Sequence, residues 1–505
     1  MKNMKKKTIL IFIGAVFISI GIFALLFNQA RENDFWPSNM TAHEQNRMNQ
    51  NNMMMGEDEQ NIEIEKNTQS ENELFIPPLL NPDSENAEEV TYSIVAKEGE
   101  FQIKEGNKTK TLGYNNDFLG PVLRLKKGQK VTINTLNQLD TNTSFHWHGL
   151  KIPSDVDGGP HQVVKPGETK TITFTVEQEA ATLWFHPHPE GETAEQVYKG
   201  LAGLMYVEDE NSNLLNIPKD YGVDDIPLIV QDKSFDKNNQ LNYESDFNSD
   251  GTQGDTLLVN GTINPSVEVN DRWIRYRIVN GSNSRNFTFS LNDNQSFYQI
   301  ASDGGLLNSL IELNSLTLSA GERAEIVVDT KAVTKGNTIQ LMTDNSVALT
   351  MKVNETRENV EFNSSLKMNS IDSIDRAAID KLDRQTIDLK GMSHMVSINN
   401  KQFERDRIDI VKKVNTQEIW EVNNISDMMG GMIHPFHIHG VQFQILSRNG
   451  QTPSENELGW KDTVSVKPDE KVELLVRFDH TGVFMYHCHI LEHEESGMMG
   501  QVEVN

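Results

Sequence analysis

The sequence of 505 residues contains a single cysteine, Cys488. One thiol cannot pair within its own chain, so a disulfide framework is excluded. Basic residues are also few, because 46 lysines and arginines stand against 73 aspartates and glutamates, for a formal net charge of −27. This charge would repel a phosphate backbone, which argues against nucleic acid as a partner, and it would favour cations near the surface.

One long apolar run stands near the N-terminus, from Thr8 to Phe27, and it is about long enough to cross a bilayer as a helix. Lysines precede the run, and positive charge keeps that end cytoplasmic and sends the rest of the chain outward. We interpret residues 1–30 as an uncleaved membrane anchor, with a cleaved signal segment and a secreted protein as the alternative. The chain is therefore expected outside the cytoplasm. No cysteine follows the run closely, which excludes a lipid-modified anchor.

Residues 31–89 are polar and rich in asparagine, glutamate and methionine, without a sustained apolar period. This composition predicts a disordered, acidic stalk. Met53, Met54 and Met55 have soft thioethers that would suit Cu(I). A stalk that is methionine-rich without a metal-binding role is the alternative.

The remainder is long enough for about three domains. Short runs of alternating polarity, such as residues 130–134, 170–176 and 471–477, are typical of strands, and glycine and proline separate them. The pattern predicts an all-β fold of sandwiches or barrels. The polar segment from about 354 to 390 is predicted to be a linker with a short helix around Ile371 to Leu382.

The only cysteine lies within a metal-ligand pattern near the C-terminus. Cys488, His493 and Met498 recur at intervals of five, and His434 is the natural second imidazole. A thiolate, two imidazoles and a weak thioether are the ligands of blue electron-transfer copper, because soft sulfur stabilises Cu(I) and imidazole suits both oxidation states. A buried, inert cysteine is the alternative, but histidines on both sides of Cys488 argue against it.

Eight more histidines occur as four His-x-His pairs. The pairs are His146 and His148, His186 and His188, His437 and His439, and His487 and His489. Side chains alternate along an extended strand, so each pair presents two imidazoles on one face. Cys488 then faces away from His487 and His489, and one strand serves two metal sites. The eight imidazoles are predicted to converge on a copper cluster.

With these motifs the chain resembles the multicopper oxidases, and among them the bacterial laccases and cuprous oxidases. The resemblance implies three cupredoxin domains, roughly at residues 90–208, 222–354 and 386–505, with all ligands in the first and third and a spacer between them. It also implies four copper ions per chain. Type 1 copper would fall on His434, Cys488, His493 and Met498, type 2 on His146 and His437, and the type 3 pair on His148, His186, His188, His439, His487 and His489.

The resemblance implies a mechanism too: single electrons enter at type 1 copper, and four of them reduce one dioxygen to two waters at the cluster. Asp157 and Glu494 match the family's positions for proton relays. For both carboxylates, the alternative is that they only orient a ligand imidazole. We expect a monomer.

The electron donor is predicted from the sequence just before His434. Asp427, Met428, Met429 and Met432 would suit docking of Cu(I), and Met392 and Met395 add further thioethers. Methionines that only fill gaps at a domain interface are the alternative. Cu(I) or small phenols are thus the expected donors, and a laccase acting mainly on phenols would need an open apolar cleft beside His434. A copper-free scaffold of the same fold, as in some cell-division relatives, is disfavoured because every ligand is present.

Overall fold

The computed structural model describes residues 62–65, 71–270, 272–331, 336–354, 363, 366–372, 374–426 and 430–505. The predicted anchor at residues 1–30, most of the predicted stalk with Met53 to Met55, and Asp427, Met428 and Met429 lie outside the described residues. Within the described part, no helix has the length and apolar character that crossing a bilayer requires.

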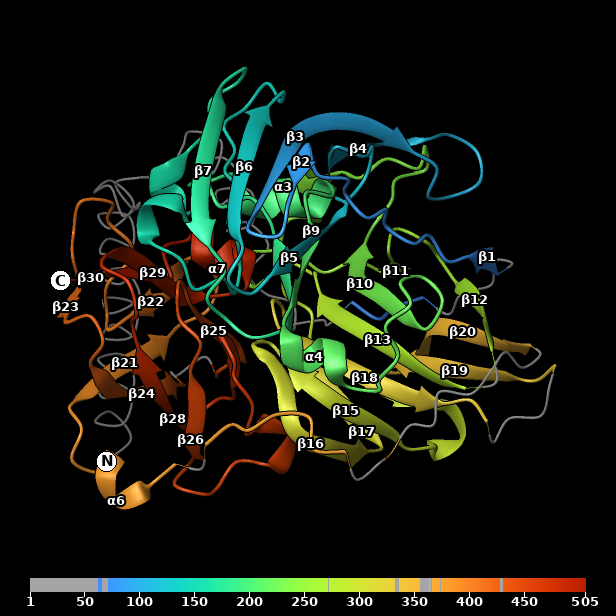
Figure 1. Ribbon diagram of the computed structural model, residues 1–505. Coiled ribbons are helices and arrows are strands. Elements are labelled where there is room, and N and C mark those ends of the chain that lie inside the picture. The colour runs from blue at the N-terminus through green and yellow to red at the C-terminus, as the bar shows by residue number, and fades with distance from the viewer. Residues whose placement is uncertain are drawn as a thin grey trace, which may run out of the picture. The chain divides into compact units, whose positions relative to one another are not determined.

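The described chain is mostly β, which confirms the predicted class. Six sheets form three pairs, coloured blue to teal, green to yellow and orange to red along the chain, except that the blue strand β1 belongs to the second pair (Figure 1). We call these pairs the first, middle and third domains. Alternation of apolar and polar residues explains the strands, as at Lys130–Asn137, where every second side chain is buried.

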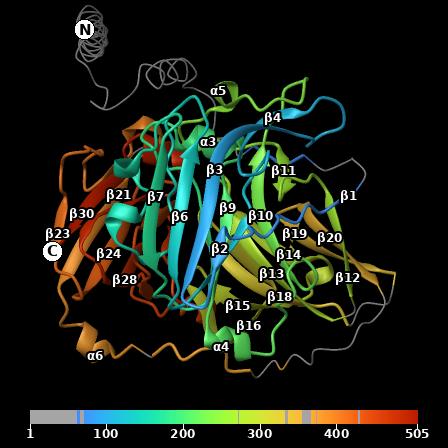
Figure 2. The ribbon, with the colours of Figure 1, turned by 45° about the horizontal axis from the view of Figure 1, so that its top comes forward.

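The first domain has a five-stranded and a three-stranded sheet. The larger contains β2 (Ser84–Glu85), β3 (Glu89–Phe101), β4 (Thr109–Tyr114), β6 (Lys130–Asn137) and β7 (Thr169–Thr175). The smaller contains β5 (Val122–Lys126), β8 (Ala181–Phe185) and β9 (Gly203–Glu208). Figure 2 shows β3, β6 and β7 side by side.

The middle domain has two six-stranded sheets. One contains β1 (Asn72–Glu73), β12 (Pro265–Asn270), β14 (Phe287–Leu291), β17 (Ser315–Leu318), β19 (Thr338–Thr343) and β20 (Ser346–Asn354). The other contains β10 (Asp225–Lys233), β11 (Thr256–Val259), β13 (Trp273–Asn280), β15 (Phe297–Ser302), β16 (Gly305–Leu313) and β18 (Arg323–Asp329). Apolar side chains from both sheets form its core.

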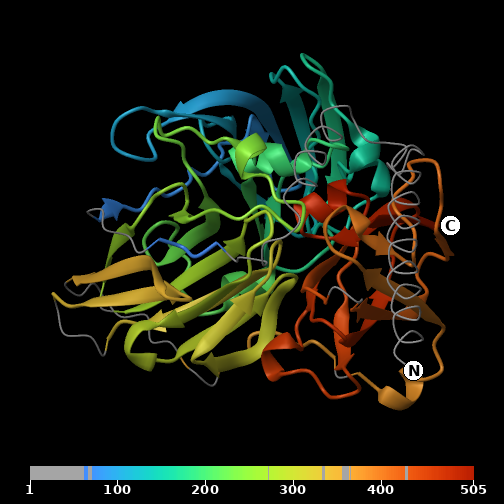
Figure 3. The same cartoon turned by 180° about the vertical axis from the view of Figure 1, so that it is seen from behind.

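The third domain has two five-stranded sheets, seen from behind in Figure 3. One contains β21 (Arg384–Lys390), β22 (Ser397–Ile398), β24 (Gln417–Ile425), β26 (Gln444–Arg448) and β28 (Lys471–Arg477). The other contains β23 (Ile410–Lys412), β25 (His434–Ile438), β27 (Thr463–Val466), β29 (Gly482–Cys488) and β30 (Met499–Val504). Its core includes Cys488 and Met498.

Among the described residues, the α-helices are short and lie in the connections. They are α3 (Thr193–Lys199), α4 (Glu210–Leu214), α5 (Tyr243–Asp246), α6 (Arg376–Ile379) and α7 (Leu491–Glu495). Helix α6 falls inside the segment predicted to form a short helix. Helix α7 of the third domain packs on α3 of the first (Figure 1).

The described residues before β3 differ from the predicted stalk. Strand β1 pairs in parallel with β12, and β2 pairs with β3. Ile64 and Leu74 are buried in the core of the middle domain. The prediction of disorder for this part of residues 31–89 was wrong, because its few apolar side chains are buried in the core of the middle domain. Its polar contacts are also distant in sequence, since the Asn72 side chain donates to the carbonyl of Ile263, 191 residues away.

Candidate metal centre

The four residues predicted to bind type 1 copper, which we call the sulfur site, lie in the third domain and are His434, Cys488, His493 and Met498. His434 begins β25 and Cys488 ends β29, and the two strands pair antiparallel. Helix α7 follows at once and carries His493. The Cys488 Sγ lies 3.5 Å from His434 Nδ1 and 3.8 Å from His493 Nδ1. Met498 is buried in the same core, and its carbonyl accepts a hydrogen bond from the Cys488 N–H.

Burial alone does not favour the charged forms of these groups. It raises the pKa of the Cys488 thiol well above its usual range. It also lowers the pKa of His434 to about 4, against the opposing effect of a hydrogen bond to the Gly391 carbonyl. The imidazoles are therefore neutral and able to bind a metal. A bound cation would supply the charge that a buried thiolate requires.

The four His-x-His pairs come together between the first and third domains. Backbone hydrogen bonds join His146 to His186 in both directions, at 2.8 and 3.2 Å. In the third domain His437 lies opposite His487 on the paired strands β25 and β29. All eight imidazoles are buried. The structure thus gathers the residues that the sequence predicts to hold a cluster.

Seven of the eight rings have one nitrogen fixed by a contact on the outside of the cluster. These contacts are His146 Nδ1 to Asp157 O (3.1 Å), His148 Nε2 to Asp462 Oδ1 (3.0 Å), His186 Nδ1 to Pro187 O (2.9 Å), His188 Nδ1 to Glu494 Oε1 (3.2 Å), His437 Nδ1 to Asp462 O (2.8 Å), His439 Nδ1 to Asp157 Oδ2 (2.7 Å) and His487 Nδ1 to Cys488 O (3.0 Å). A carbonyl only accepts, so a ring nitrogen facing one carries the proton. The other nitrogen of that neutral ring carries no proton, and its lone pair is free to bind a metal.

The lone pairs face inward. His487 Nε2 lies 3.1 Å from His439 Nε2 and 3.4 Å from His188 Nε2. Among the described residues, His146 Nε2, His437 Nε2 and both nitrogens of His489 are buried without a hydrogen-bond partner. Unpartnered buried acceptors are costly unless something binds them. The ring nitrogens therefore fit metal ions, and those of every cluster histidine except His489 fall in groups of three whose members lie within 4.8 Å of one another.

Both predicted carboxylates contact the cluster. Glu494 Oε1 and Oε2 lie 3.2 and 3.3 Å from Nδ1 of His188 and His487, and burial raises the pKa of Glu494 well above its usual range. Asp157 Oδ2 lies 2.7 Å from His439 Nδ1 and 3.4 Å from His146 Nδ1. These positions suit either a proton relay or the orienting of an imidazole.

Sequence reasoning missed Asp462 and Thr463, which precede and begin β27. Asp462 contacts both His148 and His437, and the Thr463 hydroxyl lies 3.2 Å from a ring nitrogen of each. The contact with His148 spans 314 residues of sequence. A lone aspartate before a strand is no motif, so the sequence offered little signal.

The predicted donor residues are only partly described. The side chain of Met432 packs partly buried on the third-domain core, and its carbonyl accepts from Asn424. The Gly391 carbonyl contacts the His434 ring, and Met392 directly follows Gly391 in the sequence. Met395 is 45% exposed.

Comparisons with known proteins agree with this geometry. Multicopper oxidase family models match residues 95–212, 224–355 and 376–505. Multicopper oxidase mco of Staphylococcus epidermidis is 44% identical over 466 residues, covering 92% of this chain and 99% of that protein. The crystal structure of a laccase from Pediococcus acidilactici has a TM-score of 0.83 at 42% identity, covering 88% of this chain and 95% of that one. Cell division protein FtsP of Proteus mirabilis is 34% identical over 454 residues, covering 86% of this chain and 93% of that protein.

The chain belongs to the multicopper oxidase family. It is a copper-dependent oxidoreductase with three cupredoxin-like domains and dioxygen as electron acceptor. Its cofactors are the family's four copper ions, one of type 1, one of type 2 and two of type 3.

Proposed function

We propose that this oxidase takes electrons from Cu(I) and serves copper tolerance. Type 1 copper is held by His434, Cys488 and His493 with axial Met498. Type 2 copper is held by His146 and His437, and the type 3 pair by His148, His186, His188, His439, His487 and His489. The single observation that carries the assignment of the cluster ligands is the set of inward nitrogens of seven rings, each of which has its other nitrogen in a polar contact on the far side of the ring.

Bound copper supplies the one-electron redox chemistry and the reduction of dioxygen. The chain supplies geometry and protons. Cys488 is joined through one peptide unit to His487 and to His489, so the sulfur site is covalently continuous with the cluster. Glu494 holds a proton within 3.3 Å of two cluster imidazoles, because burial favours its neutral form. Asp157 contacts the cluster through its Oδ2, which lies 2.7 Å from His439 Nδ1.

One observation supports Cu(I) over an organic phenol. Met432 stands two residues before His434 in the sequence, and the exposed Met395 follows four residues after Gly391, whose carbonyl contacts the His434 ring. Soft sulfur prefers the cuprous ion.

The test is dioxygen uptake by the copper-loaded protein with Cu(I), and then with a simple phenol, as the sole donor. Met395→Leu with Met432→Leu removes two sulfurs and keeps apolar side chains of similar size. We expect this variant to lose most Cu(I) oxidation and to keep phenol oxidation. Met342→Leu, on β19 of the middle domain, is the control. Preference for the phenol, with no effect of the double substitution, would make the protein a laccase and the methionines packing.

We also propose the location of the enzyme, its oligomeric state and the bounds of its domains. Residues 1–30 anchor it in the membrane with its catalytic domains outside the cytoplasm, and it acts as a monomer. The domains extend over about 90–208, 222–354 and 386–505, as the sequence predicts. Fractionation of cells with an antibody to the chain tests the anchor, since a cleaved segment would release the protein.

A further inference from the structure

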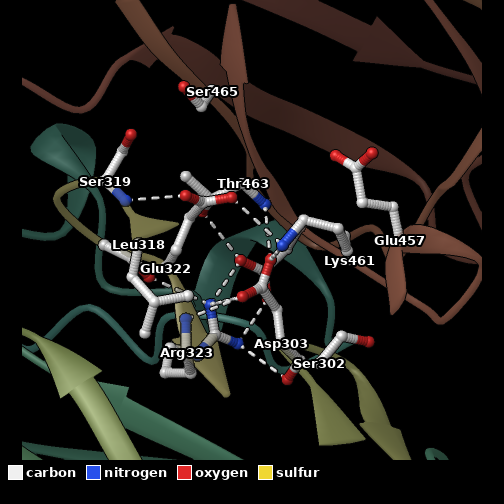
Figure 4. Close-up of polar contacts among 12 residues, drawn as sticks. Ser302, Asp303, Leu318, Ser319, Glu322, Arg323, Glu457, Lys461, Thr463 and Ser465 are labelled. Carbon is white, nitrogen blue, oxygen red and sulfur yellow. Dashed lines mark hydrogen bonds and ion pairs between the residues drawn. The ribbon is translucent and has the colours of Figure 1, made fainter. Parts of the chain in front are cut away.

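Five buried charged side chains meet where the middle domain contacts the third. Asp303, Glu322 and Arg323 come from the middle domain, and Lys461 and Asp462 from the third. None is more than 7% exposed. Figure 4 shows Asp303, Glu322 and Arg323 pointing toward Lys461 and Thr463 across the junction.

Arg323 holds Asp462 with both arms of its guanidinium. Nη1 and Nη2 donate to Oδ1 and Oδ2, each at 2.6 Å. The remaining donors are also used, on the carbonyls of Thr182, Gly321 and Asp303. A planar fork with every donor satisfied has one orientation, and it fixes the carboxylate that it binds.

Asp303 and Lys461 add further polar contacts around the Arg323–Asp462 pair. Asp303 Oδ1 accepts from the Arg323 backbone N–H at 2.7 Å, and Oδ2 lies 2.9 Å from Lys461 Nζ. Lys461 also contacts Glu322 at 3.1 Å. Each buried charge therefore has an opposite partner, without which its burial would be costly.

The fixed carboxylate faces the histidine cluster. Asp462 Oδ1 lies 3.0 Å from His148 Nε2, and the Asp462 carbonyl accepts from His437 Nδ1 at 2.8 Å. The Thr463 hydroxyl donates to Asp462 Oδ1 at 2.9 Å. Two rings, one from the first domain and one from the third, thus take their orientation from one residue.

We propose that Arg323 and Asp462 are positioning residues of the histidine cluster, through which the middle domain sets the orientation of His148 and His437. This rests on the proposed copper-ligand assignment. His148 is the ring whose Nε2 is held outside, so Nδ1 faces inward, 3.4 Å from His186 Nε2. Loss of the carboxylate contact would free that ring to turn and to exchange its tautomer. The middle domain is then part of the site, where the resemblance had implied a spacer.

The test compares two buried arginines of the middle domain. Arg323→Lys keeps the charge but replaces the two-pronged contact with a point charge. Arg277→Lys is the matched control, because Arg277 binds Asp225 with two nitrogens at 2.7 and 2.8 Å, is buried, and also contacts Thr182. Neither Arg277 nor Asp225 contacts a proposed copper ligand through any described hydrogen bond. Both variants are made in the full, copper-loaded chain.

The readouts are copper content after dialysis against a chelator, the electron paramagnetic resonance signal of type 2 copper, and the visible band of type 1 copper. We expect Arg323→Lys to retain cluster copper about 10- to 100-fold more weakly, as is typical when a residue behind a ligand is lost. Its type 2 signal should change while its type 1 band stays. Arg277→Lys should lower the melting temperature and leave both signals unchanged.

An unchanged type 2 signal and copper content in Arg323→Lys would overturn the inference, as would an equal change in Arg277→Lys. If Arg323→Lys does not fold, Asp462→Asn removes the charge with little change of shape and is expected to alter the same signals. Wild-type protein that lacks a type 2 signal would instead contradict the proposed ligand assignment.

Discussion

The sulfur site and the histidine cluster lie on the two sides of one short strand, yet they are built differently. Every proposed ligand of the sulfur site comes from residues 434 to 498 of the third domain, and its pocket is closed by that domain's own core. The cluster takes imidazoles from two domains, and Asp462 behind it is held by Arg323 from the middle one. The first site takes its proposed ligands from one domain, whereas the second takes its ligands from two and, in our proposal, their orientation from all three.

Cys488→Ser should have the largest effect and separate the two sites most cleanly. The intense visible absorption should vanish and turnover should stop, because the thiolate is the ligand that defines blue copper. The cluster should keep its three ions, since its rings are oriented by Asp157, Glu494 and Asp462. Absorption spectra and copper analysis measure both. Persistence of the blue band would refute the role of Cys488.

Glu494→Gln should act on the cluster alone, although Glu494 follows the sulfur-site ligand His493 on α7. The amide cannot deliver a proton, so reoxidation by dioxygen should slow by about 100-fold, within the usual range for a lost acid or base. Reduction of type 1 copper should be unaffected. Stopped-flow absorption follows both steps, and a normal reoxidation rate would leave Glu494 with an orienting role only.

Met498→Leu should change the sulfur site without abolishing it. Leucine is similar in size and apolar, but it removes a weak donor that stabilises Cu(II). The blue band should remain and the type 1 potential should rise in a redox titration, with the type 2 signal constant. A fall in potential would contradict the axial assignment.

Leu74→Ala should have the smallest effect on either site, but it should lower the free energy of unfolding. Leu74 is 5% exposed in the middle-domain core, and truncating such a side chain costs about 2 to 5 kcal/mol. Thermal unfolding should occur at lower temperature with unchanged copper spectra. Leu214→Ala, at a side chain 79% exposed, is the control and should change stability by less than about 0.5 kcal/mol. Equal stability of the two variants would mean that the segment before β3 contributes nothing.

The contrast between ligands that are close in sequence and contacts that join distant residues also explains which features the sequence could predict. The type 1 ligands were predictable because three of the four, Cys488, His493 and Met498, lie within eleven residues. The cluster histidines were predictable because His-x-His alternation on a strand is visible in the sequence. Strand alternation likewise gave the all-β class. Arg323 and Asp462 were not predictable, since they are ordinary charged residues whose contact spans 139 residues. Strand β1 was missed because two paired residues leave no periodic pattern.

Strand β1 also affects an exposed edge of the middle domain. In its sheet, β12 is bonded to β20 on one side and to β1 on the other. Without β1, β12 would be an open edge whose free N–H and C=O groups could recruit a strand from another chain. Strand β1 pairs with Pro265 and Ser266, so it covers the start of this edge and shortens the part that is open to another chain.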